Sequence, residues 1–238
     1  MKNRITFLMV SLLALFISPS CSKKSSSSTP SCQIVTVTDQ QGTTTTTYNI
    51  TYDNSGRIST EQYVNNGVTT NQVFTYIGNT EIMSTSNGTT DTQDSITLNS
   101  DGLIVSDYYS NSSGGSSVTT YTYSGTEVQK AILTSGANPP QTTTYTWSNG
   151  DVVSSTGSPN ITYSYNTKAT EIGDYWQVIQ LINYGASFIK TAHQLAGYQY
   201  NSTVENINYT YDNTGKITAV TGTSGSDVEN ITYQYTCN

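Results

Sequence analysis

Short segments in which aromatic or aliphatic residues alternate with hydroxyl residues make up most of the chain. A period of two is typical of β-strands, because successive side chains of a strand point to opposite faces of the sheet. The clearest segments are Tyr121-Thr-Tyr, Tyr145-Thr-Trp, Tyr163-Ser-Tyr, Tyr209-Thr-Tyr and Tyr233-Gln-Tyr. One face of the predicted sheet is therefore aromatic, and the other face carries hydroxyl groups.

These segments recur with a spacing of about 24 residues, which indicates an internal repeat. The repeat is marked by one large side chain in each unit, at Tyr52, Tyr76, Leu98, Tyr123, Trp147, Tyr211 and Tyr235. Turn sequences rich in Asp, Asn and Gly separate the strands at 53–56, 101–102, 149–150 and 212–215. We therefore predict a meander of about sixteen short antiparallel strands.

One stretch departs from this pattern. From Glu171 to Ala196 the spacing of apolar residues changes to about 3.6, the period of a helix. We expect a helix over roughly 171–183 that resumes after Gly185, within a helical insertion of about 171–196. This stretch holds the densest aliphatic surface of the chain, so we expect it to pack on the concave aromatic face of a curled sheet.

The amino terminus has the features of an export signal. A basic start, Met1 to Arg4, precedes an apolar run, Ile5 to Ile17, that is too short to span a bilayer as a helix. The following Ser18-Pro-Ser-Cys21 resembles a bacterial lipobox, with Ser18 where Leu is usual. We predict a lipoprotein signal peptide over 1–20, a lipidated Cys21, and a Ser-rich tether over 21–31. The alternative is an ordinary cleaved signal, which would leave Cys21 as a spare thiol.

The two remaining cysteines, Cys32 and Cys237, open and close a single predicted β domain over 32–238. In an oxidising compartment we expect them to form a disulfide, although two unpaired thiols are the alternative. A disulfide requires Cα atoms about 4.4–6.8 Å apart, so the first and last strands would lie side by side. The predicted fold is therefore an all-β antiparallel meander of about sixteen strands, curled into a roll or barrel around one helical segment.

Charge and composition exclude several classes of protein. The sequence has 9 Lys and Arg against 16 Asp and Glu, and only 11% of its residues are charged. Coiled coils and helical bundles need many charged residues and helix formers, and nucleic-acid binders need a basic surface. We therefore expect no nucleic-acid partner.

The turn sequences carry a resemblance to a known repeat. The pattern Tyr-x-Tyr-Asp-x-x-Gly-Arg/Lys-Ile is intact at 209–217, and at 50–58 Ile50 replaces its first Tyr. This pattern resembles the YD repeat of RHS proteins. With the lipobox, the hairpins, the late helix and the Tyr-x-Cys ending, residues 32–238 resemble a Bacteroidetes lipoprotein family of unknown function (the DUF4595 type).

That resemblance implies a curled or barrel-like antiparallel sheet in an outer-membrane lipoprotein, on either face of the membrane, and it implies no activity. Its membrane contact would be the lipid anchor. In addition, Asp94-Ser95-Ile96 resembles the O-glycosylation motif of such bacteria, which makes Ser95 a candidate glycosylation residue.

Catalytic chemistry is not indicated by the sequence. Histidine occurs once, at His193, and no partner residues stand at the spacing of a metal site or of a Ser/His or Cys/His dyad. Asp53, Asp101 and Asp212 fall in predicted turns, where a carboxylate accepts backbone hydrogen bonds. We therefore predict a protein that is not an enzyme and that has no metal site and no cofactor.

Three functional hypotheses follow. The first is a non-enzymatic envelope lipoprotein that binds or scaffolds an unidentified protein or glycan. The second is a glycan-binding module that uses exposed aromatic residues, with Trp147 facing outward at a strand end and Tyr145 beside it. The third is a carrier of an apolar ligand, which requires an aromatic cavity that the helix leaves empty. A membrane-spanning barrel is disfavoured, because its lipid face needs aliphatic residues in strands of about 9–11 residues.

Overall fold

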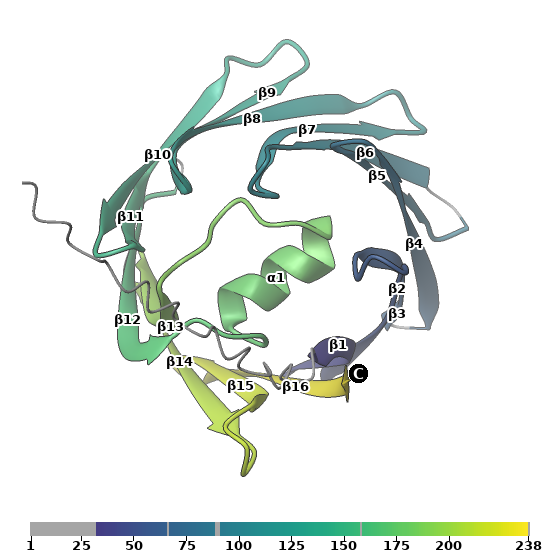
Figure 1. Cartoon of the computed structure of the whole chain (residues 1–238). Helices are drawn as coiled ribbons and strands as arrows, with labels where there is room; N and C mark the ends of the chain where they lie inside the picture. The colour runs from purple at the N-terminus through teal and green to yellow at the C-terminus, as the bar shows by residue number, and fades with distance from the viewer. Residues whose placement is uncertain (1–31, 66, 89–90, 158, 238) are drawn as a thin grey trace, which may run out of the picture. The chain divides into compact units, whose positions relative to one another are not determined.

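The computed structural model describes residues 32–65, 67–88, 91–157 and 159–237; the predicted signal, Cys21 and the tether lie outside these residues. In the described residues, sixteen antiparallel strands form one closed barrel. Each strand pairs with its neighbours in chain order, and β1 closes the ring by pairing with β16. Figure 1 shows this ring with one helix, α1, inside it. The predicted fold class and strand number are confirmed.

The strands are short and joined mostly by tight turns. The first eight are β1 (Cys32–Gln41), β2 (Thr44–Tyr52), β3 (Ile58–Asn65), β4 (Val68–Ile77), β5 (Thr80–Ser86), β6 (Asp91–Leu98), β7 (Ile104–Asn111) and β8 (Ser116–Ser124). The others are β9 (Glu127–Ser135), β10 (Gln141–Ser148), β11 (Asp151–Thr156), β12 (Ile161–Ala169), β13 (His193–Tyr200), β14 (Thr203–Tyr211), β15 (Ile217–Ser224) and β16 (Asp227–Cys237). Helix α1 (Tyr175–Tyr184) lies between β12 and β13.

Exposure alternates along the strands as the sequence predicts. On β16, Ile231 and Tyr233 are buried, whereas Thr232 and Gln234 between and after them are exposed. The outward side chains of neighbouring strands bond to one another, as in the 2.6 Å contact between the Oγ1 atoms of Thr51 and Thr60. The barrel therefore has an apolar and aromatic interior and an outer surface of hydroxyl and amide groups.

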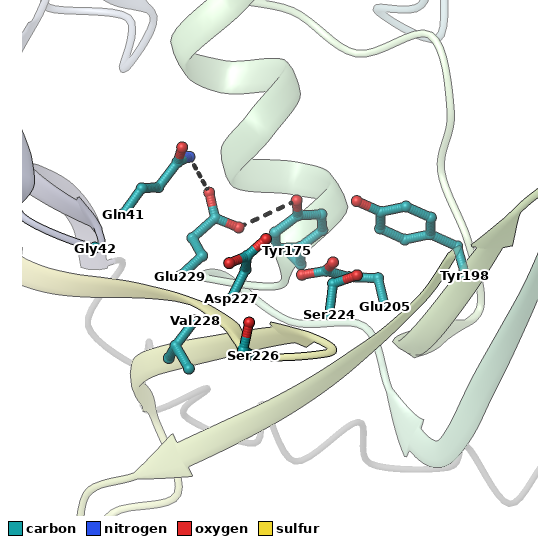
Figure 2. A pocket seen from close by; sticks show the side chains of 10 residues that line it. All are labelled: Gln41, Gly42, Tyr175, Tyr198, Glu205, Ser224, Ser226, Asp227, Val228 and Glu229. Carbon is teal, nitrogen blue, oxygen red and sulfur yellow. Dashed lines mark hydrogen bonds between the residues drawn. The ribbon is translucent and has the colours of Figure 1, made fainter. Parts of the chain in front are cut away.

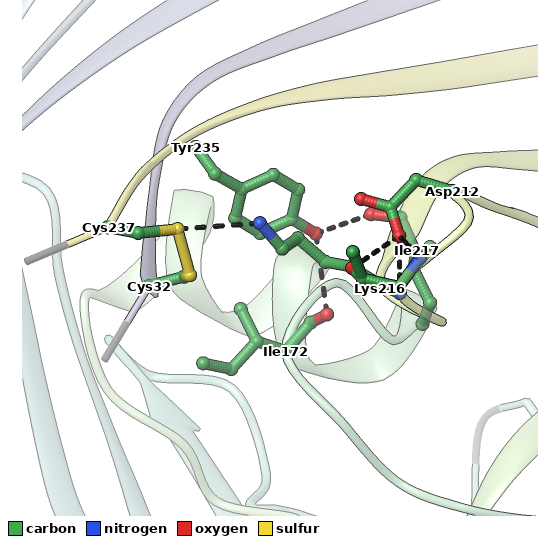
Figure 3. The surroundings of a disulfide bond; sticks show 8 residues. Cys32, Ile172, Asp212, Lys216, Ile217, Tyr235 and Cys237 are labelled. Carbon is green, nitrogen blue, oxygen red and sulfur yellow. Dashed lines mark hydrogen bonds between the residues drawn. A yellow bond between two sulfur atoms is a disulfide. The ribbon is translucent and has the colours of Figure 1, made fainter. Parts of the chain in front are cut away.

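The meander gives the barrel two distinct ends. Cys32 starts β1 at one end and is paired in register with Cys237, which finishes β16 at the same end. The two residues form the predicted disulfide, with their Cα atoms 4.0 Å apart (Figure 3). We call this the disulfide end. The turns that follow odd-numbered strands, such as the one at Gly42, lie at the opposite end.

The repeated aromatic residues bond an even-numbered strand to the strand before it. Five of the six donate a hydrogen bond to a backbone carbonyl 18 or 19 residues earlier in the chain, whereas Tyr211 donates to Gln194 Oε1 (2.7 Å). These bonds, which we call aromatic staples, are Tyr52 to Ile34 (2.6 Å), Tyr76 to Ile58 (2.9 Å), Tyr123 to Ile104 (2.6 Å), Trp147 to Val128 (2.6 Å) and Tyr235 to Ile217 (2.6 Å). Three acceptors, Ile58, Ile104 and Ile217, begin a strand beside a shift in register. A polar aromatic residue therefore bonds a backbone carbonyl of the preceding strand at five of the seven repeat positions, and Leu98 and Tyr211 are the exceptions.

The Arg or Lys residue of each YD-like turn contacts the ring of the aromatic staple that bonds to the same turn. Arg57 precedes the acceptor Ile58, and its guanidinium lies 4.0 Å from the centre of the Tyr76 ring. Lys216 precedes Ile217 in the same way, and its ammonium lies 4.8 Å from the centre of the Tyr235 ring (Figure 3). Such cation–π contacts contribute about 0.5–1 kcal/mol at exposed sites. The turn and the next repeat are thus held together by one ring.

Helix α1 crosses the lumen between opposite walls. At its start, Asp174 accepts a hydrogen bond from the Trp176 amide (3.0 Å) and one from the Tyr209 hydroxyl on β14 (3.0 Å). At its end, Gly185 has a φ of 68°, and an added Cβ would collide with Phe74 and with Glu81 on the far wall. Only glycine suits that position, because it needs both the left-handed conformation and the missing side chain.

The expected resumption of the helix after Gly185 is wrong, and β13 already begins at His193. The cause is Gln180, whose side chain is 2% exposed. Its amide oxygen accepts hydrogen bonds from the Phe188 and Ile189 amides (both 2.8 Å), and its amide nitrogen donates to the Ile189 carbonyl (3.0 Å). These bonds replace the backbone bonds that a second helix would make.

Helix and loop fill the interior as predicted. Val178 and Ile182 of α1 belong to one buried cluster with residues of the barrel wall, and Ile189 joins a second cluster with Val128 and Val152. Tyrosine rings pack around both clusters. Within the described residues, no helix has the length and apolar character needed to cross a membrane.

We predict that Tyr76→Phe lowers the free energy of unfolding by about 1 kcal/mol, because the Ile58 carbonyl loses its side-chain donor while the ring stays packed. Urea unfolding followed by circular dichroism measures this loss. Tyr108→Phe is the control, since Tyr108 is an exposed residue of the outer surface. Equal stability of the two variants would contradict a structural role for the staple.

Candidate functional site

A pocket of about 720 Å³ opens at the opposite end of the barrel, away from the disulfide. The start of α1 and the adjoining ends of β13 to β16, with the turn after β1, form its walls (Figure 2). The side chains that line it are mostly polar, namely Gln41, Tyr175, Tyr198, Glu205, Ser224, Ser226, Asp227, Val228 and Glu229, with Gly42 completing the lining. Its volume lies in the range typical of small-ligand sites.

Two of the three carboxylates in this pocket meet above one glycine. Glu205 on β14 and Glu229 on β16 lie on either side of Gly222 on β15. Gly222 occupies a position of β15 that faces the lumen. An added Cβ at Gly222 would collide with Glu205 Oε1 and would lie 3.3 Å from Glu229 Oε2. Burial, together with the charges of Glu229 and Asp227, raises the pKa of Glu205. The missing side chain of Gly222 therefore makes room for two like charges.

Hydrogen bonds extend this acidic group inward. Gln41 Nε2 donates to Glu229 Oε1 (2.7 Å) and to Asp39 Oδ2 (3.3 Å), as Figure 2 shows in part. The other oxygen of Asp39 is buried without a hydrogen-bond partner. Burial and the charge of Glu229 raise the pKa of Asp39 to about 6. Asp39 is therefore a fourth acid, joined to Glu229 of the pocket through the shared Gln41 side chain.

Two tyrosines form the aromatic wall. The hydroxyl of Tyr175, the first residue of α1, lies 3.5 Å from Glu229 Oε2 (Figure 2). Tyr198 on β13 stands beside it, and burial raises the pKa of both phenols. Both therefore stay neutral at physiological pH and present hydroxyl groups and ring faces to the pocket.

The described lysines and arginine all lie away from this pocket. None of them lines it. Arg57 and Lys216 follow turns at the disulfide end, and Lys190 donates to the Asp101 carbonyl of another turn at that end (2.9 Å). The carboxylates of the pocket are thus not neutralised by any described lysine or arginine in its lining. Among the described residues, no group of three or more His, Cys, Asp or Glu side chains is arranged to hold a metal ion.

Further acids point into the lumen from strands β3 to β7. Glu61 is 1% exposed, and neither of its carboxylate oxygens has a hydrogen-bond partner. Burial raises the pKa of Glu61 to about 8 and that of Glu81 to about 7. Burial and the neighbouring Asp107 raise the pKa of Asp94 to about 7. These acids are therefore largely protonated at mildly acidic pH.

The residues proposed for glycan binding lie on the inner face. The expected outward orientation of Trp147 is wrong: its ring packs on the cluster around Val128, and its Nε1 is the staple donor to the Val128 carbonyl. The alternation of β10 decides this, because Trp147 has the same parity as the inward Tyr145. Both side chains are thus engaged in the core, and their glycan-binding role stays a prediction.

Other predicted residues are placed as follows. Ser95 is half-buried on the outer surface, in register with Ile82 and Tyr108, and its glycosylation stays a prediction. His193 lies at the start of β13, where its Nδ1 is 2.7 Å from Asp151 Oδ2 and its amide donates to Asp151 Oδ1 (2.9 Å). This contact anchors the end of the insertion.

Lipidation of Cys21 is a prediction outside the described residues.

Two of the three turn acids behave as the sequence predicts. Asp53 Oδ1 accepts hydrogen bonds from the amides of Ser55 (2.8 Å) and Arg57 (3.0 Å), and Asp212 does the same in its own turn. At 99–103, however, Asn99 rather than Asp101 accepts these bonds. The carboxylates of Asp53 and Asp212 thus accept backbone hydrogen bonds as predicted, and the same expectation for Asp101 is wrong.

Sequence reasoning missed the pocket acids. Glu205 and Glu229 occupy equivalent positions, each four residues before the first Tyr of a Tyr-x-Tyr segment. This spacing places both on the aromatic face of the sheet, where a carboxylate is out of character. A search for acids in phase with the tyrosines would have found them.

Comparison with known proteins supports the fold. No family model matches the chain, and no curated protein matches it. A crystal structure of a porin-like protein from Bacteroides uniformis has a TM-score of 0.61 at 11% identity, covering 85% of this chain and 96% of that one. A porin-like protein from Bacteroides vulgatus has a TM-score of 0.57 at 12% identity, covering 85% and 98%. At this identity the likeness shows a shared barrel fold, and the YD-type family membership stays a prediction.

We predict that the protein loses stability as the pH rises from about 5 to about 8. The native state keeps Glu61 protonated up to about pH 8, whereas the unfolded chain releases this proton near the ordinary value of 4.5. Its contribution is complete below the unfolded pKa, and each pH unit above it removes about 1.4 kcal/mol per such carboxyl. Urea unfolding at several pH values measures the slope.

The matched variants are Glu61→Gln and Asp91→Asn, because Asp91 is exposed on the outer surface. We expect Glu61→Gln to flatten the pH dependence and to raise stability at the alkaline end, and Asp91→Asn to leave the slope unchanged. Identical slopes in all three proteins would show that Glu61 is not the source of the effect.

Proposed function

We propose that this protein is a non-enzymatic envelope lipoprotein whose barrel stays in water and whose pocket binds a ligand. The observation that carries the proposal is the chemistry of the outer surface. Along β14, the outward residues Asn206, Asn208 and Thr210 are exposed, whereas Ile207 between them is buried. The arrangement is the inverse of a membrane barrel, which is apolar outside and polar inside.

Burial of this surface in lipid would be costly. Hydroxyl and amide groups without hydrogen-bonding solvent cost on the order of 2–7 kcal/mol each. The exposed aliphatic side chains, such as Val73 and Ile77, stand among exposed polar neighbours instead of forming a continuous band. We therefore assign membrane attachment to the lipid predicted at Cys21 and not to the strands.

The chain order keeps the pocket apart from the point of attachment. The predicted tether joins the barrel at Cys32, at the disulfide end, and the pocket opens at the opposite end. A lipid at Cys21 would therefore leave the mouth of the pocket free of the tether.

The other two hypotheses find less support. An apolar carrier needs an empty lumen, but Val178 and Ile182 of α1 are packed against the wall in the middle of it. Glycan binding through Trp147 would require breaking its staple to Val128. The acidic pocket, by contrast, is open to solvent, and its carboxylates lie outside the buried apolar clusters.

We predict that Cys21→Ser moves the protein from the membrane fraction to the soluble fraction of the envelope, because the polar barrel has no affinity for lipid of its own. Fractionation with detection by antibody measures the shift, and Ser22→Ala is the control that keeps the acylated residue. Retention of Cys21→Ser in washed membranes would contradict the proposal, since it would mean that the strands or another segment hold the protein there.

A further inference from the structure

We infer that the pocket at the opposite end binds a primary alkylammonium group, supplied by a free polyamine or by a lysine side chain of a partner protein. The inference rests on the proposed binding function and adds the chemistry of the ligand. Three features carry it: the sign of the charge, the supply of hydrogen-bond acceptors, and the apolar surface beside the carboxylates.

The charge selects a cation. Glu205, Asp227 and Glu229 line the pocket, Asp39 shares the Gln41 donor with Glu229, and none of the described lysines or arginine is among the lining residues. An anion would meet only like charges here. A cation would relieve the repulsion that the two glutamates above Gly222 exert on each other.

The hydrogen-bonding groups select a ligand that donates. Two of the pocket's donors, Gln41 Nε2 and the Tyr175 hydroxyl, are already directed at Glu229. The remaining side-chain hydroxyls of the lining can accept as well as donate, namely those of Tyr198, Ser224 and Ser226. The six oxygens of the three carboxylates leave most of their acceptor capacity unused, and Asp39 Oδ1 is buried without a partner. An ammonium group has three donors and no acceptor, so it matches this surplus better than a polyol, which needs donors in return.

The surroundings select an alkyl chain on the ammonium. The rings of Tyr175 and Tyr198 stand beside the carboxylates, and ring faces attract cations and cover methylene groups. Val228, which is 44% exposed, also lines the pocket. A bare metal ion would leave most of the 720 Å³ empty and these apolar side chains without a contact.

The test is isothermal titration calorimetry with the full protein in detergent, using two probes. Spermidine represents the free polyamine, and the peptide acetyl-Val-Lys-Val-amide represents a lysine on a partner chain. We expect saturable binding of at least one probe, and the tighter of the two identifies the source of the ammonium. Acetyl-Val-Gln-Val-amide, which lacks the charge, should bind at least about tenfold more weakly than the lysine peptide.

Glu229→Gln and Glu205→Gln should each weaken binding by about tenfold or more, while the outer-surface control Asp91→Asn should leave it unchanged. Asp227→Asn gives an independent test if a glutamate variant unfolds, because Asp227 is exposed and its side chain accepts no bond that the fold needs. Binding of neither probe to the folded protein would overturn the inference, and so would equal binding in all variants. Displacement of a bound probe by calcium at lower concentration would also overturn it, in favour of a metal site.

These outcomes are separate from the proposed attachment. Fractionation of Cys21→Ser tests how the barrel is held, and it needs no ligand. Calorimetry on the intact protein tests only the pocket, so the ligand assignment fails alone if neither amine binds while Cys21→Ser is still released from the membrane.

Discussion

A closed ring of sixteen strands encloses more space than its own side chains can fill, and this constraint governs the rest of the structure. Of the 4 Phe in the sequence only Phe74 and Phe188 belong to residues 32–238, whereas all 19 Tyr do. Tyrosine fills volume as well as phenylalanine does, but each buried hydroxyl needs a hydrogen-bond partner. The staples meet that need by using backbone carbonyls at irregular points of the ladder, as Tyr235 does with Ile217. Volume and hydrogen bonding are thus solved by the same residue.

The remaining space is taken by the insertion. Helix α1 carries a buried aliphatic face, but it is held as much by polar contacts, through Asp174 at its start and Gln180 near its end. A wall that must bond to such groups cannot be purely apolar, and it also admits acids such as Glu61. The protonation of these acids links stability to pH. The same tolerance for acids lets Glu205 and Glu229 face the lumen where it meets water.

Much of this architecture follows from local pattern. The alternation of apolar and polar residues predicts the strands and their two faces, and the Asp and Gly residues predict the turns. The cysteine pair predicts that the first and last strands lie side by side. Long-range polar contacts are different, because they depend on which residues the closed barrel brings together. Gln180 ends the helical insertion through amides eight and nine residues later, and no period in the sequence signals that contact. Likewise, Trp147 looks like a surface residue beside a turn until the Val128 carbonyl is known to lie within reach.

The likeness to porin-like barrels shows a shared backbone arrangement, which by itself does not determine the chemistry of either face of the sheet. Strand number and closure determine the ring, but the side chains at alternate positions determine which phase each face contacts. In this chain the parity that carries Ile231 and Tyr233 points inward, and the parity that carries Thr232 and Gln234 points outward. Shifting the pairing of the strands by one residue would exchange the two faces. The tyrosine staples prevent that shift, because each bonds correctly in a single register, so they fix the barrel's relation to its solvent as well as its shape.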